Sequence, residues 1–254
     1  MGTRTNTSID TFGLYFSGHL VFEAVLESLS AQMAGASDIL ITGDSAGGIG
    51  SWTKVDYLRN RFPNARVTGA PLAGMYFYAF PYTGPNATHS ILAPFDPPGI
   101  DALFSLYRPY LNEDCVAAYT AMGLSPSPCM LGNYSQLYVK SDMFVTEAQT
   151  DSVQLEDHDD IPGEYVHLPP EQEYLAAWKA NMTQALSRFL DPSQPRLGAF
   201  HPACYIHTSF SPSKPLIKGE SFLKAASSWY SASGDPSEYK LSDGCGIMCN
   251  PTCP

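Results

Sequence analysis

The stretch DILITGDSAGGIGSW, residues 38–52, constrains the fold most, because an aliphatic run leads through a glycine-framed serine into a segment of helical spacing. The residues around Ser45 match G-x-S-x-G, in which small neighbours permit a sharp turn from a strand into a helix. Such a turn lifts the serine hydroxyl above the end of a parallel sheet. The stretch therefore predicts an α/β fold in which Ser45 is a nucleophile. The backbone N–H of Ala46, and that of Gly47, would then start the helix and face a developing oxyanion.

Two other interpretations of this motif are weaker. A phosphate-binding loop would need the lysine of a P-loop or the spacing G-x-G-x-x-G, and neither is present. The motif also resembles the GDSGG of trypsin-like proteases, but those enzymes carry their histidine and aspartate before the serine. Only His19 precedes Ser45, within a segment of helical spacing. Chain order therefore argues against such a protease.

The rest of the chain continues the alternation of strand and helix. We expect helices over 19–33, 51–62 and 170–190, and strands over 38–42, from 65, and over 142–149, with a Pro- and Gly-rich loop over 81–100. The continuously aliphatic run 38–42 predicts a central strand buried on both faces. This order predicts an α/β-hydrolase-like, mostly parallel sheet with helices on both faces. Residues 1–254 form one domain that ends in a cysteine-rich tail, 245–254.

Composition excludes several classes of protein. The formal net charge of −11 argues against nucleic-acid binding, and no apolar run approaches the 18 residues of a transmembrane span. Six cysteines, three of them in CGIMCNPTC without nearby histidines, favour disulfides over zinc, and four N-x-[ST] sequons also occur. We expect a secreted, monomeric chain without cofactor or metal. Its polar start carries no signal peptide, which suggests a mature or N-terminally truncated piece.

A serine nucleophile needs a histidine base and an orienting acid, and in this fold both follow it in loops at the ends of strands. Asp151 follows the strand predicted over 142–149, and His207 comes late in the chain, after the long helix. Asp142 precedes that strand and so lies at the wrong end of the sheet. The other candidates are Asp157, Asp159 and Asp160 in a charged run expected to be solvated, His158 in the same run, His167 before a proline pair, and His201 before a proline.

In these motifs the chain resembles the pectin acetylesterase/Notum family of serine carboxylesterases. The likeness rests on YFSG, GDSAGGIG, VTGAPLAGMYF, MFVTEAQTDSVQL, ACYIH and the tail CGIMCNPTC, in this order. It implies a triad of Ser45, Asp151 and His207 that removes acyl groups, most simply acetyl, from an extracellular polysaccharide such as pectin. It also implies disulfides that join Cys115 to Cys129 and Cys204 to one of Cys245, Cys249 and Cys253.

Three departures from the family pattern leave alternatives open. Ser17 stands where the family has arginine, Ala73 stands where it has aspartate, and only 44 residues precede Ser45, without the family's upstream oxyanion element. A Notum-like lipid deacylase of a protein, or a binding relative without turnover, therefore remains open. A lipase-type carboxylesterase would need an upstream His-Gly-Gly-Gly element, which is absent. The aromatic run 74–82 either lines an acyl- or sugar-binding wall or packs in the core.

Overall fold

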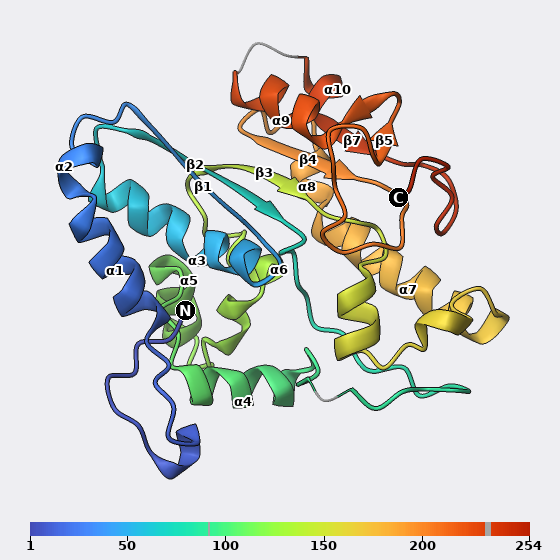
Figure 1. The fold of residues 1–254 in the computed structure, drawn as a ribbon, viewed down its shortest axis with the longest axis horizontal. Coiled ribbons are helices and arrows are strands. Elements are labelled where there is room, and N and C mark those ends of the chain that lie inside the picture. The colour runs from blue at the N-terminus through green and yellow to red at the C-terminus, as the bar shows by residue number, and fades with distance from the viewer. Residues whose placement is uncertain (91, 232–234) are drawn as a thin grey trace.

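A five-stranded parallel sheet forms the centre of the molecule (Figure 1). The computed structural model describes residues 1–90, 92–231 and 235–254. In spatial order, the strands are β1 (Asp38–Asp44), β2 (Arg66–Leu72), β3 (Asp142–Thr146), β4 (Leu197–His201) and β7 (Lys240–Ser242). A short antiparallel pair, β5 (Leu216–Ile217) and β6 (Glu220–Ser221), lies outside this sheet.

Helices connect these strands, as the alternating sequence pattern predicts. They are α1 (Gly18–Ser28), α2 (Ser30–Met33), α3 (Ala46–Arg61), α4 (Pro97–Tyr107), α5 (Glu113–Ala121), α6 (Gly132–Ser135), α7 (Pro169–Ala185), α8 (Ser187–Leu190), α9 (Phe222–Tyr230) and α10 (Pro236–Tyr239). Shorter helical turns are η1 (Ile9–Thr11), η2 (Ser127–Met130), η3 (Gln154–His158) and η4 (Gly163–Tyr165). Within the described ranges, no helix is both long enough and apolar enough to cross a membrane.

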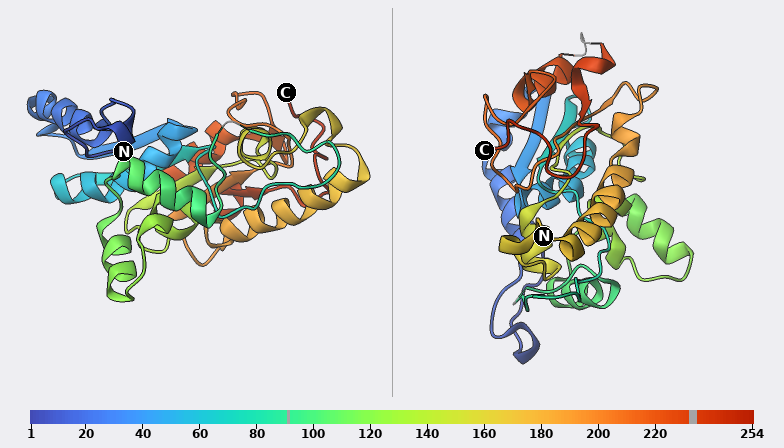
Figure 2. Two further views of the ribbon diagram at one scale, coloured as in Figure 1. Left: turned by 90° about the horizontal axis from the view of Figure 1, so that it is seen from below. Right: turned by 90° about the vertical axis from the view of Figure 1, so that its right-hand side faces the viewer.

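Helices cover both faces of the sheet, which confirms the predicted architecture. Met143 and Val145 of β3 pack into one core together with side chains of α3 and α7. Phe144, between them in sequence, points the other way and joins Phe200 and the α9 residue Trp229 in a second core. This alternation follows from the two-residue period of a strand. Both views in Figure 2 show the green segment that contains α5 projecting from one side of the sheet.

The strand that leads into Ser45 lies at an edge of the described sheet. β1 pairs with β2 in parallel register, and no described strand pairs with its other side. Its residues alternate between exposed and half-buried, and Leu40 is 48% exposed. The expectation of a central strand buried on both faces is therefore wrong for this chain. An aliphatic run predicts a strand, but the number of strands that pair with it depends on distant parts of the chain.

Several element boundaries differ from those that the sequence predicts. α3 begins at Ala46, directly after the serine, and β3 ends at Thr146, three residues earlier than expected. The end of the predicted loop 81–100 already belongs to α4, because Asp96 caps that helix by accepting the N–H of Gly99 (2.8 Å). Proline is favourable in the first helical turn, so PPG starts this helix instead of preventing it.

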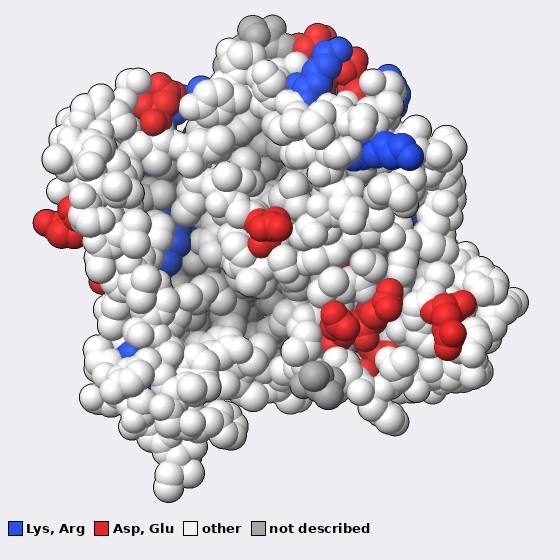
Figure 3. Space-filling view, viewed as in Figure 1, with Lys and Arg blue, Asp and Glu red and all other residues white. Residues whose placement is uncertain are grey.

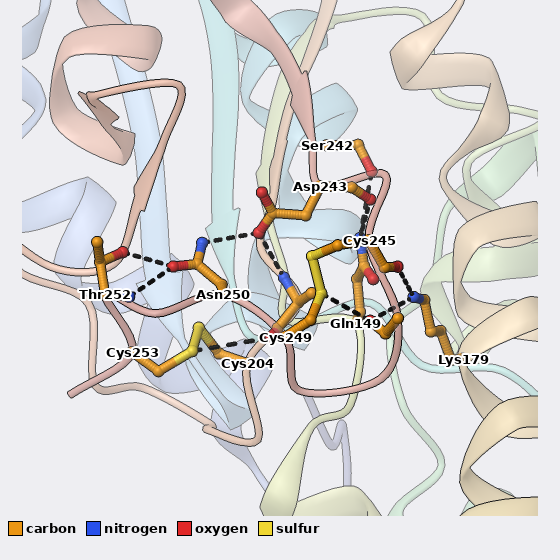
Figure 4. The surroundings of a disulfide bond; sticks show 12 residues. Gln149, Lys179, Cys204, Ser242, Asp243, Cys245, Cys249, Asn250, Thr252 and Cys253 are labelled. Carbon is orange, nitrogen blue, oxygen red and sulfur yellow. Dashed lines mark hydrogen bonds between the residues drawn. A yellow bond between two sulfur atoms is a disulfide. The ribbon is translucent and has the colours of Figure 1, made fainter.

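Three disulfide bonds cross-link the chain. They join Cys115 to Cys129, Cys204 to Cys253, and Cys245 to Cys249. The first two confirm the pairings that the resemblance implies. The tail is also held by hydrogen bonds, shown in Figure 4: Lys179 Nζ donates to the carbonyls of Cys245 and Gly246, both at 2.9 Å, and Asn250 Nδ2 donates to Asp243 Oδ2 at 2.7 Å. The C-terminal tail is thereby fixed against α7 and the loop after β4.

Candidate active site

Ser45 occupies the sharp turn that the sequence predicts. It follows the last residue of β1 and is the N-cap residue of α3. Its backbone has φ 54° and ψ −120°, a region that residues with a side chain rarely adopt. Its N–H donates to the Leu72 carbonyl at the end of β2 (3.0 Å), which holds the turn against the neighbouring strand. The serine is therefore presented at the carboxyl end of the sheet.

Two close backbone contacts permit this turn, and both need glycine. A Cβ atom on Gly43 would lie 2.6 Å from the carbonyl carbon of Gly47. A Cβ atom on Gly48 would lie 2.9 Å from the Cα of Gly74, in the segment after β2. Close backbone packing at the Ser45 turn thus explains Gly43 and Gly48, whereas a Cβ atom on Gly47 would meet nothing within 4 Å.

The helix start leaves two amides near Ser45 outside the helical ladder. The carbonyl of Ser45 accepts its hydrogen bond from the N–H of Ile49 (3.0 Å), so Ala46 and Gly47 lie in the first turn of α3. N–H groups in a first turn have no intrahelical acceptor and point toward the helix N-terminus. This location agrees with the oxyanion role expected for Ala46 and Gly47, which stays a prediction.

Asp151 and His207 form a buried pair. Asp151 Oδ2 lies 2.7 Å from His207 Nδ1, and Asp151 Oδ1 accepts the N–H of Gln154 (2.9 Å). The Asp151 side chain is fully buried. Around the pair, Thr150 Oγ1 donates to the carbonyl of Cys204 (2.8 Å). The segment after β3 and the segment after β4 are thus fastened together where the acid and the base meet.

The contact with Asp151 leaves the second ring nitrogen of His207 free. Because Asp151 accepts from Nδ1, the lone pair of neutral His207 lies on Nε2. Nε2 is buried and has no hydrogen-bond partner among the residues that the structure describes. A buried polar atom without a partner is uncommon, and catalytic groups are among the explanations.

Tyr76 connects the serine with the acid. Its hydroxyl lies near the side chain of Ser45, and both residues line the same cleft. Burial raises the pKa of Tyr76, and the nearby carboxyls of Asp151 and Glu147 raise it further. Tyr76 therefore lies beside Ser45 and close enough to sense Asp151. The sequence left open whether the run 74–82 lines a binding wall or packs in the core, and the structure divides it: Tyr76 lines a cleft, whereas Phe77 packs in the core.

His201 and Asp142, two of the alternative candidates, lie apart from the Asp151–His207 pair. His201 is fully buried; its Nδ1 donates to the carbonyl of Glu147 (2.8 Å), and Thr183 donates to its Nε2 (3.3 Å). Burial lowers the pKa of His201 to about 4. Asp142 begins β3, at the opposite end of the sheet from Asp151, and pairs with Arg196 at 3.2 Å. The structure thus brings together the acid and base that the sequence favours.

The charged run after Asp151 is only partly solvated, contrary to expectation. His158 is half-buried, stacks on Phe95 with ring centroids 4.0 Å apart, and donates from Nδ1 to the carbonyl of Ala93 (2.8 Å). Burial lowers the pKa of His158. Asp159 is 1% exposed and accepts from Trp178 Nε1 (2.8 Å), whereas Asp157 and His167 are exposed. This charged run comes soon after Asp151 in the sequence, and that closeness could have indicated that it lies beside the site.

A cleft of about 660 Å³ opens at Ser45. Figure 3 shows this face of the molecule hollowed near its middle, with mainly uncharged side chains around the hollow. Ser45 and Ala46 line the cleft, and no Lys, Arg, Asp or Glu is among its described lining residues. Its other walls are mostly apolar or aromatic: Tyr15, Phe16, Ile49, Tyr76, Leu92, Phe95, Ile100, Leu103, Tyr107, Met130, Leu131 and Val153, with His158 at one side. The cleft therefore suits an uncharged, largely apolar group.

The described residues contain no group of three or more His, Cys, Asp or Glu side chains that could hold a metal ion.

The structure also shows where two departures from the family pattern lie. Ser17 precedes α1 and lines the cleft. Ala73 is buried with φ 47°, and its N–H donates to the Thr146 carbonyl (2.8 Å).

A parallel sheet covered by helices on both faces, with a strand–serine–helix turn and an Asp–His pair at its carboxyl end, defines an α/β-hydrolase-like protein. The chain belongs to the pectinacetylesterase family, whose model matches residues 2–254.

Known relatives agree with this membership. Pectin acetylesterase 5 of Arabidopsis thaliana is 25% identical over 272 residues, covering 94% of this chain and 57% of the relative. The palmitoleoyl-protein carboxylesterase notum1' of Xenopus laevis is 26% identical over 264 residues, covering 95% and 52%. The chain thus spans about half the length of these curated relatives. The solved structure of the Wnt deacylase Notum from Drosophila shares the fold, with a TM-score of 0.76 at 21% identity, covering 100% of this chain and 69% of that one.

Proposed function

We propose that this chain hydrolyses carboxylic esters through Ser45, His207 and Asp151. The Asp151–His207 contact of 2.7 Å carries the proposal, because it leaves Nε2 of the same imidazole buried and without a partner in a segment that, like Ser45, follows the carboxyl end of a strand. A serine hydroxyl becomes a useful nucleophile only with such a base.

In the proposed reaction, Ser45 Oγ attacks the ester carbonyl while its proton passes to His207 Nε2. The amides of Ala46 and Gly47 donate to the oxygen that becomes negatively charged. The tetrahedral intermediate collapses, and the imidazolium of His207 gives its proton to the departing alcohol. Water, activated by His207 in the same way, then releases the acid and restores Ser45. Asp151 holds the Nδ1–H tautomer and stabilises the imidazolium throughout.

The cleft supports an acyl group larger than acetyl. Its walls are mostly apolar, and Ser45 lies among them, so an acyl chain bound there would gain from leaving water. One relative is named as a palmitoleoyl-protein carboxylesterase. An apolar acyl ester, attached to a protein or another carrier, is therefore the substrate class that we favour.

Removal of acetyl from a polysaccharide is the second candidate. Aromatic side chains such as Tyr15, Phe16 and Tyr107 line the cleft and could stack on sugar rings, and another relative is named as a pectin acetylesterase. Three disulfides support work in an oxidising, extracellular setting in either case.

A chain-length series of p-nitrophenyl esters, from acetate to dodecanoate, tests both candidates, with Ser45→Ala as the control. Values of kcat/KM that rise with the length of the acyl chain, together with loss of activity in Ser45→Ala, support the apolar acyl substrate. Activity confined to acetate moves the substrate to the polysaccharide class. A fluorophosphonate probe that labels neither the wild type nor the variant would contradict the activated serine itself.

A further inference from the structure

Glu147 is a buried carboxyl directly behind the proposed triad. It follows the last residue of β3 and is 0% exposed. Its backbone is held on both sides: its N–H donates to the Phe200 carbonyl (3.0 Å), and its carbonyl accepts from His201 Nδ1 (2.8 Å). The side chain therefore extends from a fixed point, four residues before Asp151.

The two oxygens of Glu147 have different surroundings. Oε2 accepts the N–H of Met75 (2.8 Å), and the N–H of Gly74 lies near the same carboxyl. Oε1 is buried and receives no N–H or O–H from the described residues. The carboxyl of Asp151 lies close to that of Glu147, near enough for a hydrogen bond between the two side chains when one of them carries a proton.

Two adjacent buried carboxyls do not both ionise, because each charge disfavours the other. Asp151 receives the Nδ1–H of His207 and the N–H of Gln154, so Asp151 is the member that carries the charge. Burial raises the pKa of Glu147 well above its ordinary value, and the charge of Asp151 raises it further. The titratable groups around Glu147 are Asp151, Tyr76 from the segment after β2, His207 beyond Asp151, and His201 on its backbone. None of them supplies a stable positive charge to Glu147.

We propose that Glu147 is a positioning residue that keeps its proton and donates it in a hydrogen bond to Asp151, while its other oxygen fixes the backbone of Gly74 and Met75. The next residue is Tyr76, which contacts Ser45. One neutral side chain thus ties the serine side of the site to the acid–base pair. Gln154 adds a second tie, because its Nε2 donates to the Met75 carbonyl (3.2 Å). This inference rests on the proposed triad.

Glu147→Gln tests the protonation state, because glutamine is neutral, has nearly the same shape, and can donate to Asp151 while accepting from Met75. We expect kcat within about threefold of wild type and an unchanged acidic limb of kcat/KM. An ionised Glu147 predicts a different result: removing a negative charge near Asp151 lowers the pKa of His207, and the limb moves to lower pH by about one unit or more. That shift would overturn the proposal. Glu171→Gln is the matched control, since Glu171 is equally buried but contacts Tyr82.

Glu147→Leu tests positioning, because leucine can neither donate nor accept. We expect kcat to fall about 10- to 100-fold, as when an outer partner that orients a histidine is removed, with KM within about twofold. A kcat equal to wild type would refute the role. Should this variant fail to fold, the pH profile of Glu147→Gln still decides the question.

Histidine NMR keeps the test separate from the proposed activity. If the wild type hydrolyses no ester, the proposed function fails, but the pKa of His207 can still be followed through its ring ¹⁵N and ¹H shifts. Equal His207 titrations in wild type and Glu147→Gln support the neutral carboxyl, and a lower pKa in the variant refutes it.

Discussion

Asp151 and His207 are 56 positions apart in the chain, yet their Oδ2 and Nδ1 atoms lie 2.7 Å apart. The contact forms because the segments after β3 and β4 run side by side, with Thr150 opposite Tyr205. The hydrogen bond therefore joins the proposed acid and base through segments that are themselves held together, with the Asp151 side chain fully buried.

Asp151→Asn should lower kcat by about 10⁴-fold, because asparagine favours the wrong tautomer of His207 without removing the hydrogen bond. Asp142→Asn, at the opposite end of the sheet, should stay within about twofold of wild type. Ester hydrolysis by both purified variants checks this. Equal losses would remove the argument from strand ends.

His207→Ala should reduce turnover to the level of Ser45→Ala, because residues of one triad act as a unit. His201→Ala should instead destabilise the fold by about 2 kcal/mol, since it leaves the Glu147 carbonyl and the Thr183 hydroxyl without their buried partner. Kinetics and urea denaturation on both variants separate the two roles. Loss of turnover in a stable His201→Ala variant, with His207→Ala active, would exchange the assignments.

Leu103→Trp should shorten the acyl chain that the protein accepts, because Leu103 lines the cleft at Ser45. We expect dodecanoate hydrolysis to fall at least about tenfold relative to acetate, as expected when a bulky group blocks an apolar pocket. Leu137→Trp, an exposed position outside the cleft, is the control. An unchanged chain-length profile in Leu103→Trp would place the acyl group elsewhere.

Replacing Cys204 and Cys253 by serine should destabilise the fold by about 4 kcal/mol and lower kcat, because this bond closes a long loop and holds the segment that leads to His207. The same change at Cys245 and Cys249, which are only four positions apart, should cost about 2 kcal/mol. Denaturation and kinetics on the two double variants test this order. A larger kcat loss in the second pair would contradict the anchoring role.

Stability should depend on pH through Asp159. Burial raises its pKa from the ordinary 3.8 to about 7, so the folded chain retains a proton that the unfolded chain releases. The contribution of protonated Asp159 to the free energy of unfolding is complete below pH 3.8 and is lost as the pH rises to about 7. Asp159→Asn can still accept from Trp178 and should remove this decline. Unfolding free energies of both proteins from pH 4 to 8 test the sign; parallel curves would show that Asp159 does not cause it.

Local sequence determines much of this site, and tertiary contacts determine the rest. The Ser45 turn depends on its own glycines and flanking elements, so its pattern was readable. Asp151 follows a strand that the sequence predicts, whereas His207 was selected by its late place in the chain and by the family resemblance, and the strand before it, β4, was not predicted. Tyr76, His158 and Glu147 could not be assigned in this way, because their roles depend on which side chains distant segments bring beside them. The edge position of β1 escaped prediction for the same reason.

The backbone conformation of Ser45 lowers the stability of the fold. A φ of 54° with ψ −120° costs a residue with a side chain about 1–3 kcal/mol, whereas glycine adopts such angles freely. Local backbone energetics therefore favours the Ser45→Gly chain, which lacks the proposed nucleophile. A more stable chain would thus come with the loss of the hydroxyl that the proposed reaction uses.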